Sequence, residues 1–196
     1  GSLTKVGPGK LTMEQFINNT FSGSLTVAEG EINARSGKAR NDLTISAGAI
    51  FSQNGSLALN QDSKESTVVD GTLNLNSRGV SDVNSYSVNI GTLSGASTGV
   101  ITATSTAATH TVNISGDTND GEFAGEMQGT LALVKSGSAK LTLTGNNSHV
   151  GATTVSEGAL VVNGSLPATS AVTINNGGTL GGNGTVNGPI ILASGA

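Results

Sequence analysis

Two stretches of the chain carry the same sequence pattern, about 130 residues apart. Residues 3–57 align with residues 133–186, and Leu, Lys, Gly, Lys and Leu fall at the same offsets at the start of both copies. Later in each copy a Val-x-Glu-Gly sequence ends at Gly30 or at Gly158. A unit that repeats at a fixed period and cannot bury its apolar face alone packs against its neighbours, so the repetition predicts a solenoid. We therefore expect the function to belong to an array of stacked units and not to a compact enzyme.

The composition favours an aliphatic interior and a surface of short polar side chains. Gly accounts for 29 of the 196 residues, charged residues for 11% and aromatic residues for 3%. Leu, Ile, Val and Phe together make up roughly a quarter of the chain, above the level at which chains stay disordered. Thr, Ser and Asn take the place of charged residues, which keeps an exposed β surface soluble.

Charge and cysteine content exclude several classes of partner and site. The net charge of −4 and the pI near 5.0 argue against nucleic acid and anionic membranes as partners. The absence of Cys excludes disulfides, a thiolate nucleophile and Cys-based metal sites. The longest aliphatic run, at residues 189–193, is far too short to span a bilayer, so we expect no membrane insertion.

The distribution of apolar residues predicts short strands with one buried face. Apolar and small polar residues alternate over short segments, which is the period of a strand. Asn-Gly, Gly-Gly, Ser-Gly and Asp-Gly pairs between these segments turn the chain. The predicted strands cover residues 24–27, 42–45, 71–75, 87–90, 111–114, 140–144, 159–162 and 171–174.

Two all-β architectures accommodate these strands. A β-sandwich needs hairpin pairs and usually a more aromatic core, whereas a parallel β-helix needs short strands, Gly- and Asn-rich corners and repetition. The internal repeat favours an all-β, right-handed parallel β-helix with roughly 20–25 residues in each coil.

We expect one continuous solenoid fragment. Residues 3–132 form its first β-helical repeat module, and residues 133–196 start a second, truncated module.

The second copy contains a series of short motifs in a fixed order. These are Lys-x-Gly at residues 135–137, Leu-x-Leu-x-Gly at 141–145, Thr-Thr-Val at 153–155 and Gly-x-Leu at 158–160. In this order they resemble the autotransporter-associated β-strand repeat of bacterial passenger domains. The sequence departs from that repeat at three positions, since Ala139 and Ala152 stand where Gly is usual and His149 where an aromatic residue is usual. The resemblance implies a secreted, β-helical passenger at the bacterial cell surface, with roles in adhesion and virulence.

The titratable residues form no recognisable catalytic, cofactor or metal motif. The two His, His110 and His149, have no adjacent nucleophile or carboxylate motif, and we expect His149 to pack as a flat ring at a corner. The acidic segment 117–122 superficially resembles a calcium loop, but its Gly falls at the wrong position and no closing Glu follows. A polar turn is the favoured interpretation of this segment. We expect no catalytic residue, no cofactor and no metal ion in the chain.

Arg35, Lys38 and Arg40 form a small basic cluster in a chain with few charges. Such a cluster is a candidate contact for a sulfated glycan or another polyanion, although a solvated loop fits the acidic total better. It is the one candidate binding site that the sequence offers.

Three functions follow from these observations. The leading one is a rigid β-helical stalk or adhesive surface without catalysis, whose partner is a glycan or protein on a host or neighbouring cell. The second is a polysaccharide-degrading enzyme on the same fold, although the 13 acidic residues show no pair at coil spacing. The third is a self-associating module that mediates bacterial aggregation through an exposed side or edge.

Overall fold

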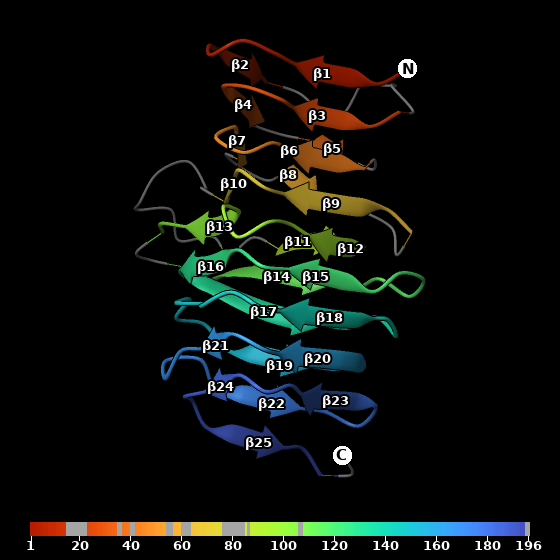
Figure 1. Cartoon of the computed structure of the whole chain (residues 1–196), viewed down its shortest axis with the longest axis vertical. Coiled ribbons are helices and arrows are strands. Elements are labelled where there is room, and N and C mark those ends of the chain that lie inside the picture. The colour runs from red at the N-terminus through yellow and green to blue at the C-terminus, as the bar shows by residue number, and fades with distance from the viewer. Residues whose placement is uncertain are drawn as a thin grey trace.

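Short parallel strands stack into an elongated β-solenoid, with the N-terminal coils at one end of the long axis and the C-terminal coils at the other (Figure 1). This computed structural model describes residues 1–14, 23–34, 37–39, 42–53, 57–59, 64–75, 85, 87–105 and 108–194. The all-β parallel β-helix predicted from the repeat is confirmed. The described part of the chain contains no helix with the length and apolarity that a membrane crossing requires.

The first strand of each coil belongs to one face of the solenoid. Two sheets make up this face, and a bridge between Gly95 and Phe123 joins them. Their strands are β1 (Leu3–Lys5), β3 (Leu25–Val27), β6 (Leu43–Ile45), β9 (Ser66–Val69), β12 (Thr92–Ser94), β15 (Gly121–Phe123), β18 (Lys140–Leu143), β20 (Gly158–Val162) and β23 (Gly178–Gly181).

The second strand of each coil belongs to the next face. Its strands are β2 (Lys10–Met13), β4 (Glu31–Ala34), β7 (Ile50–Gln53), β10 (Thr72–Leu75), β13 (Val100–Ala103), β16 (Glu126–Gly129), β21 (Ser165–Leu166) and β24 (Thr185–Val186). In the coil between β16 and β21 this face has no strand, and an isolated bridge pairs Asn146 with Ser165 of β21.

The third strand of each coil completes the cross-section. The strands of this face are β5 (Gly37–Ala39), β8 (Leu57–Leu59), β11 (Ser87–Ile90), β14 (His110–Ile114), β17 (Leu131–Lys135), β19 (Thr153–Val155), β22 (Val172–Ile174) and β25 (Ile190–Leu192). The last six form one sheet in this order, and every pair in it is parallel.

The number of residues per coil varies along the solenoid. Leu25 pairs with Leu43, 18 residues later, whereas Thr72 pairs with Val100, 28 residues later. The expected period of roughly 20–25 residues therefore describes the average, and the turns between strands absorb the difference. A parallel ladder tolerates this because only the strands have to stay in register.

The interior consists of aliphatic side chains in columns that run along the solenoid axis. Leu141 pairs with Leu160, and Leu143 pairs with Val162, and all four side chains are buried. The period-2 pattern thus points alternate residues inward, as predicted for residues 140–144. Among the described residues, Phe51 and Phe123 are the aromatic rings that the core encloses.

All eight predicted strands are present, with boundaries that differ by at most one residue. Most strands of the second face escaped prediction, however. In β4 and β7 three consecutive residues are buried, including Asn33, Ser52 and Gln53, so the apolar alternation that marks a strand is missing there.

Candidate functional site

The Lys-x-Gly motif of the second copy forms a structural clamp between two coils. The side chain of Lys135 is 1% exposed and takes an inward position of β17, where the residues paired with it are Ile114 and Val155. Its ammonium donates to the carbonyl oxygen of Gly137 and, at 3.5 Å, to that of Glu157 in the next coil. Burial lowers the pKa of Lys135, and the nearby carboxylates oppose this shift.

The first copy makes the same clamp. The ammonium of Lys5 donates to the carbonyl oxygens of Gly7, at 2.6 Å, and of Glu29, at 3.3 Å. In addition, the amide of Gly7 donates to the carboxylate of Glu29 at 3.1 Å. The conserved spacing between the two copies therefore encodes a contact between coils.

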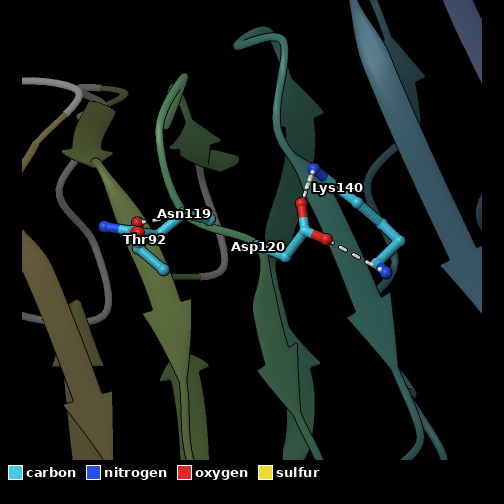
Figure 2. A network of polar contacts seen from close by, with 4 residues as sticks. All are labelled: Thr92, Asn119, Asp120 and Lys140. Atoms are coloured by element: carbon cyan, nitrogen blue, oxygen red, sulfur yellow. Dashed lines mark hydrogen bonds and ion pairs between the residues drawn. The ribbon is translucent and has the colours of Figure 1, made fainter.

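The acidic segment that resembles a calcium loop uses its carboxylates to bind the next coil. Asp117 accepts a hydrogen bond from the amide of Ser138 at 2.9 Å, and Asp120 accepts one from the amide of Lys140 at 2.9 Å. Asp120 also forms an ion pair with the Lys140 ammonium at 3.0 Å (Figure 2). The hydrogen bond from Lys140 lowers the pKa of Asp120.

The same turn also contacts the preceding coil. The hydroxyl of Thr92 donates to the carbonyl oxygen of Asn119 at 3.3 Å, so the turn touches coils on both sides (Figure 2). The polar turn expected from the sequence is therefore present. Within the described ranges, no three His, Cys, Asp or Glu side chains gather as metal ligands.

Both His side chains lie in the interior. His149 is fully buried at the corner that precedes β19, as expected, and its Nε2 lies 3.1 Å from the hydroxyl of Thr153. That hydroxyl lies 2.8 Å from the hydroxyl of Ser170. Ser170, Thr153 and His149 have the order of a hydroxyl relay, but all three are sealed from solvent and a substrate cannot reach them. The sequence spacing of His149, Thr153 and Ser170 gave no signal from which these contacts could have been predicted.

The predicted basic cluster stays a prediction. Arg35 and Arg40 lie outside the described residues. Lys38 lies in β5, where it pairs with Ala58 of β8. The structure therefore leaves the predicted contact between this cluster and a polyanion open to experiment.

The outer side of the sheet β11–β14–β17–β19–β22–β25 carries no charged side chain. Lys135 and His110, the ionisable residues of these six strands, both point into the core. We call this surface the uncharged face. Its central column, in register from strand to strand, consists of Asn89, Asn113, Val134, Thr154, Thr173 and Ile191.

Hydrogen bonds between neighbouring coils fix the polar groups of the uncharged face. The Asn113 amide donates to the side-chain oxygen of Asn89 at 2.9 Å, and the Ser136 hydroxyl donates to that of Asn113 at 2.7 Å. Six strands at ~4.8 Å spacing make this face roughly 25 Å long. By contrast, the first face presents Glu122 and Lys140 to solvent. The uncharged face is thus an ordered surface without charged side chains, and we treat it as the candidate contact surface.

Comparison with protein families identifies the repeat itself. Residues 3–34 and residues 133–162 match the family described as the Passenger-associated-transport-repeat. Each match starts just before one of the two lysine clamps and includes the glycine at the end of Val-x-Glu-Gly. Both copies of the internal repeat therefore match this family, and the resemblance to autotransporter passengers predicted from residues 135–160 is confirmed.

One curated relative is named as an autotransporter adhesin. A segment of 95 residues, 48% of this chain, is 38% identical to the Adhesin BmaC autotransporter of Brucella suis biovar 1 (strain 1330). The segment spans 3% of that adhesin's length. No solved structure matches the chain significantly.

Proposed function

We propose that this chain is a segment of a secreted, cell-surface autotransporter passenger, in which it serves as a rigid, non-catalytic β-solenoid with an adhesive face. The observation that carries the proposal is the uncharged face, because it is broad, ordered and free of charged side chains. The two passenger repeats and the similarity to a protein named as an adhesin support the cellular location and the adhesive role.

Rigidity comes in part from side chains that bond several turns to the next coil. The carboxylate of Asp42 accepts from the amide of Ser66, and that of Asp70 accepts from the amide of Ala96, both at 2.7 Å. With Asp117 and Asp120, these carboxylates cap backbone amides that the parallel ladders leave open. Acidic side chains used in this way hold a stalk together and are not arranged as a pair for glycosidic bond cleavage.

The chemistry of the uncharged face suits a neutral partner. Hydroxyl and amide groups donate and accept hydrogen bonds, so they match the hydroxyls of a neutral glycan or the polar surface of a host or neighbouring-cell protein. A polyanion finds no positive charge on this face, and the cluster of Arg35, Lys38 and Arg40 is the basic site that the sequence suggests for it.

The test is binding of the folded chain to an array of neutral glycans, sulfated glycans and matrix proteins. The variant Thr154→Lys together with Thr173→Lys places two charges on the uncharged face, and Thr142→Lys on the outer side of β18 is the matched control. We expect a saturable ligand whose binding the double variant abolishes and the control retains. Binding that all variants share, or that only the removal of the basic cluster abolishes, would refute the assignment to this face.

Self-association is a second candidate that the uncharged face favours. Two copies that each carry a net charge of −4 repel least where neither presents a charge. Sedimentation equilibrium at several concentrations separates the candidates. A mass that rises with concentration and falls back to that of the monomer in the double variant supports self-association, and a constant monomer mass removes it.

A further inference from the structure

The corner around His149 is bonded to the coil before it through its backbone. The amides of residues 148–151 donate to the carbonyl oxygens of Met127, Gly129 and Leu131 at 2.8–3.1 Å. The Met127 carbonyl accepts two of these bonds, from Ser148 and His149. The position of the corner thus depends on one row of backbone hydrogen bonds.

The same corner is bonded to the coil after it through side chains. His149 Nε2 lies 3.1 Å from the Thr153 hydroxyl, which lies 2.8 Å from the Ser170 hydroxyl. The hydroxyl of the neighbouring Thr169 donates to the carbonyl oxygen of His149 at 3.2 Å. The His149 ring is therefore the link between the backbone bonds on one side and the hydroxyl chain on the other.

The second ring nitrogen of His149 has no hydrogen-bond partner. Nδ1 is fully buried and makes no hydrogen bond to any described group. A neutral ring tolerates this arrangement, because one nitrogen carries a proton and bonds Thr153 while the other keeps its lone pair. A doubly protonated ring would bury a positive charge and an unbonded N–H together, which is costly.

We propose that His149 makes this corner an acid-sensitive latch, closed while the ring is neutral and opened when both ring nitrogens carry a proton. The open state releases residues 148–151 from the preceding coil and residues 169–170 from the ring. The solenoid then gains a local hinge without unfolding as a whole, because each coil of a solenoid contacts only its neighbours.

Charged groups on the surrounding elements are few. β19 and residues 167–171 carry no titratable side chain. On β16, Glu126 is half-buried and its carboxylate accepts from the Ser148 hydroxyl, outside the core. Lys135 on β17 and His110 on β14 are buried, and neither side chain can offer a negative charge to the protonated ring.

The direction of the pH dependence follows from burial. Burial lowers the pKa of His149 to about 4, against the 6.5 of a free imidazole, and the backbone of Met127 opposes the shift. Because the folded pKa lies below the unfolded one, the corner is fully stable above pH 6.5 and loses stability as the pH falls toward 4. A shift of this size raises the opening constant on the order of 100-fold between pH 7.5 and pH 4.5.

The test is amide hydrogen exchange of the whole chain at pH 7.5 and pH 4.5, corrected for the intrinsic rates. We expect the protection of residues 148–151 to fall about 100-fold in the wild type and to stay nearly constant in His149→Phe, whose ring cannot be protonated. His110→Phe is the matched control and should keep the wild-type loss. An equal loss in wild type and His149→Phe, or an equal loss along β14 and β17, overturns the proposal.

A second measurement covers the case in which His149→Phe does not fold. NMR titration of the two imidazoles in the wild type reports the protonation of each ring directly. A His149 ring that stays neutral down to pH 5 and titrates together with the loss of protection supports the latch. A ring that titrates near pH 6.5 in the folded chain overturns it.

Discussion

The two copies of the internal repeat make the same contacts at different depths of burial. Lys135 and Lys5 bind equivalent carbonyl oxygens, yet Lys135 is 1% exposed and Lys5 is only half-buried. Likewise Leu141 is 0% exposed, whereas its counterpart Leu11 is 37% exposed. β18 is paired on both sides, with β15 and β20, while β2 is paired on one side, with β4. The motif therefore sets the contacts, and the neighbouring coils set the burial.

The second lysine of the repeat forms an ion pair in both copies, but with a carboxylate from a different neighbouring coil. Lys10 pairs with Glu31 of the following coil at 3.0 Å, whereas Lys140 pairs with Asp120 of the preceding coil at the same distance. The residue of the following coil in register with Lys140 is Ala159, which has no carboxylate. An exposed lysine thus finds a carboxylate on either side, so this ion pair is not a fixed part of the repeat.

The largest difference between the copies is expected when a charge replaces the core leucine. Leu141→Asp buries an unpaired carboxylate and should lower the free energy of unfolding by ~4 kcal/mol. Leu11→Asp, whose side chain reaches water, should cost ~1 kcal/mol or less. Urea unfolding of both variants measures the difference. An unchanged melting temperature for Leu141→Asp would refute its inward position.

Replacement of the glycine at the end of Val-x-Glu-Gly should destabilise both copies by a similar amount. Gly158 and Gly30 have φ of +67° and +68°, and an added Cβ at either would lie 2.4 Å from a backbone oxygen of the preceding coil. We expect Gly158→Ala and Gly30→Ala each to cost roughly 2–3 kcal/mol, from the left-handed backbone and the clash. Thermal unfolding of the two variants checks this, and a neutral effect at either position would contradict the shared geometry.

Removal of the clamp lysine should again lower the free energy of unfolding by different amounts in the two copies, with a smaller difference than for the core leucine. Lys135→Ala leaves the buried carbonyl oxygen of Gly137 and the partly buried one of Glu157 with fewer hydrogen bonds, and it leaves a cavity, at a cost of ~2 kcal/mol. Lys5→Ala should cost ~0.5 kcal/mol, because water can reach the same carbonyls. Lys135→Met keeps the volume and isolates the hydrogen bonds. Equal losses for Lys135→Ala and Lys5→Ala in urea unfolding would show that burial does not decide the strength of the clamp.

The smallest effects are expected at the exposed ion pairs. Asp120→Asn and Glu31→Gln remove the carboxylates that pair with Lys140 and Lys10. Both should lower the melting temperature slightly at low salt and by less at high salt, because salt screens exposed charges. The lowered pKa of Asp120 means that its contribution is present at neutral pH and is lost as the pH falls below the ordinary range of an Asp. A loss that does not depend on salt would point instead to the amide that Asp120 caps.

Sequence patterns predicted the fold further than they predicted the surface. The eight predicted strands, the inward Leu141 and Leu143 and the buried ring of His149 all followed from period-2 alternation and from the repeat. Most strands of the second face did not, and in β4 and β7 the reason is that the polar residues Asn33 and Gln53 are buried. The division into modules 3–132 and 133–196 and the polyanion contact at Arg35, Lys38 and Arg40 stay predictions.

By itself the sequence determined that this chain stacks repeated units and which residues of the eight predicted strands face inward, because both properties are local and periodic. Only the tertiary structure decided which residues of adjacent coils lie beside one another. The residues of the uncharged face are about 20 positions apart, and the offset between paired residues varies from 18 to 28, so no fixed spacing reveals the face. The partners of Lys135 and His149 likewise come from adjacent coils, and stacking alone brings them into contact.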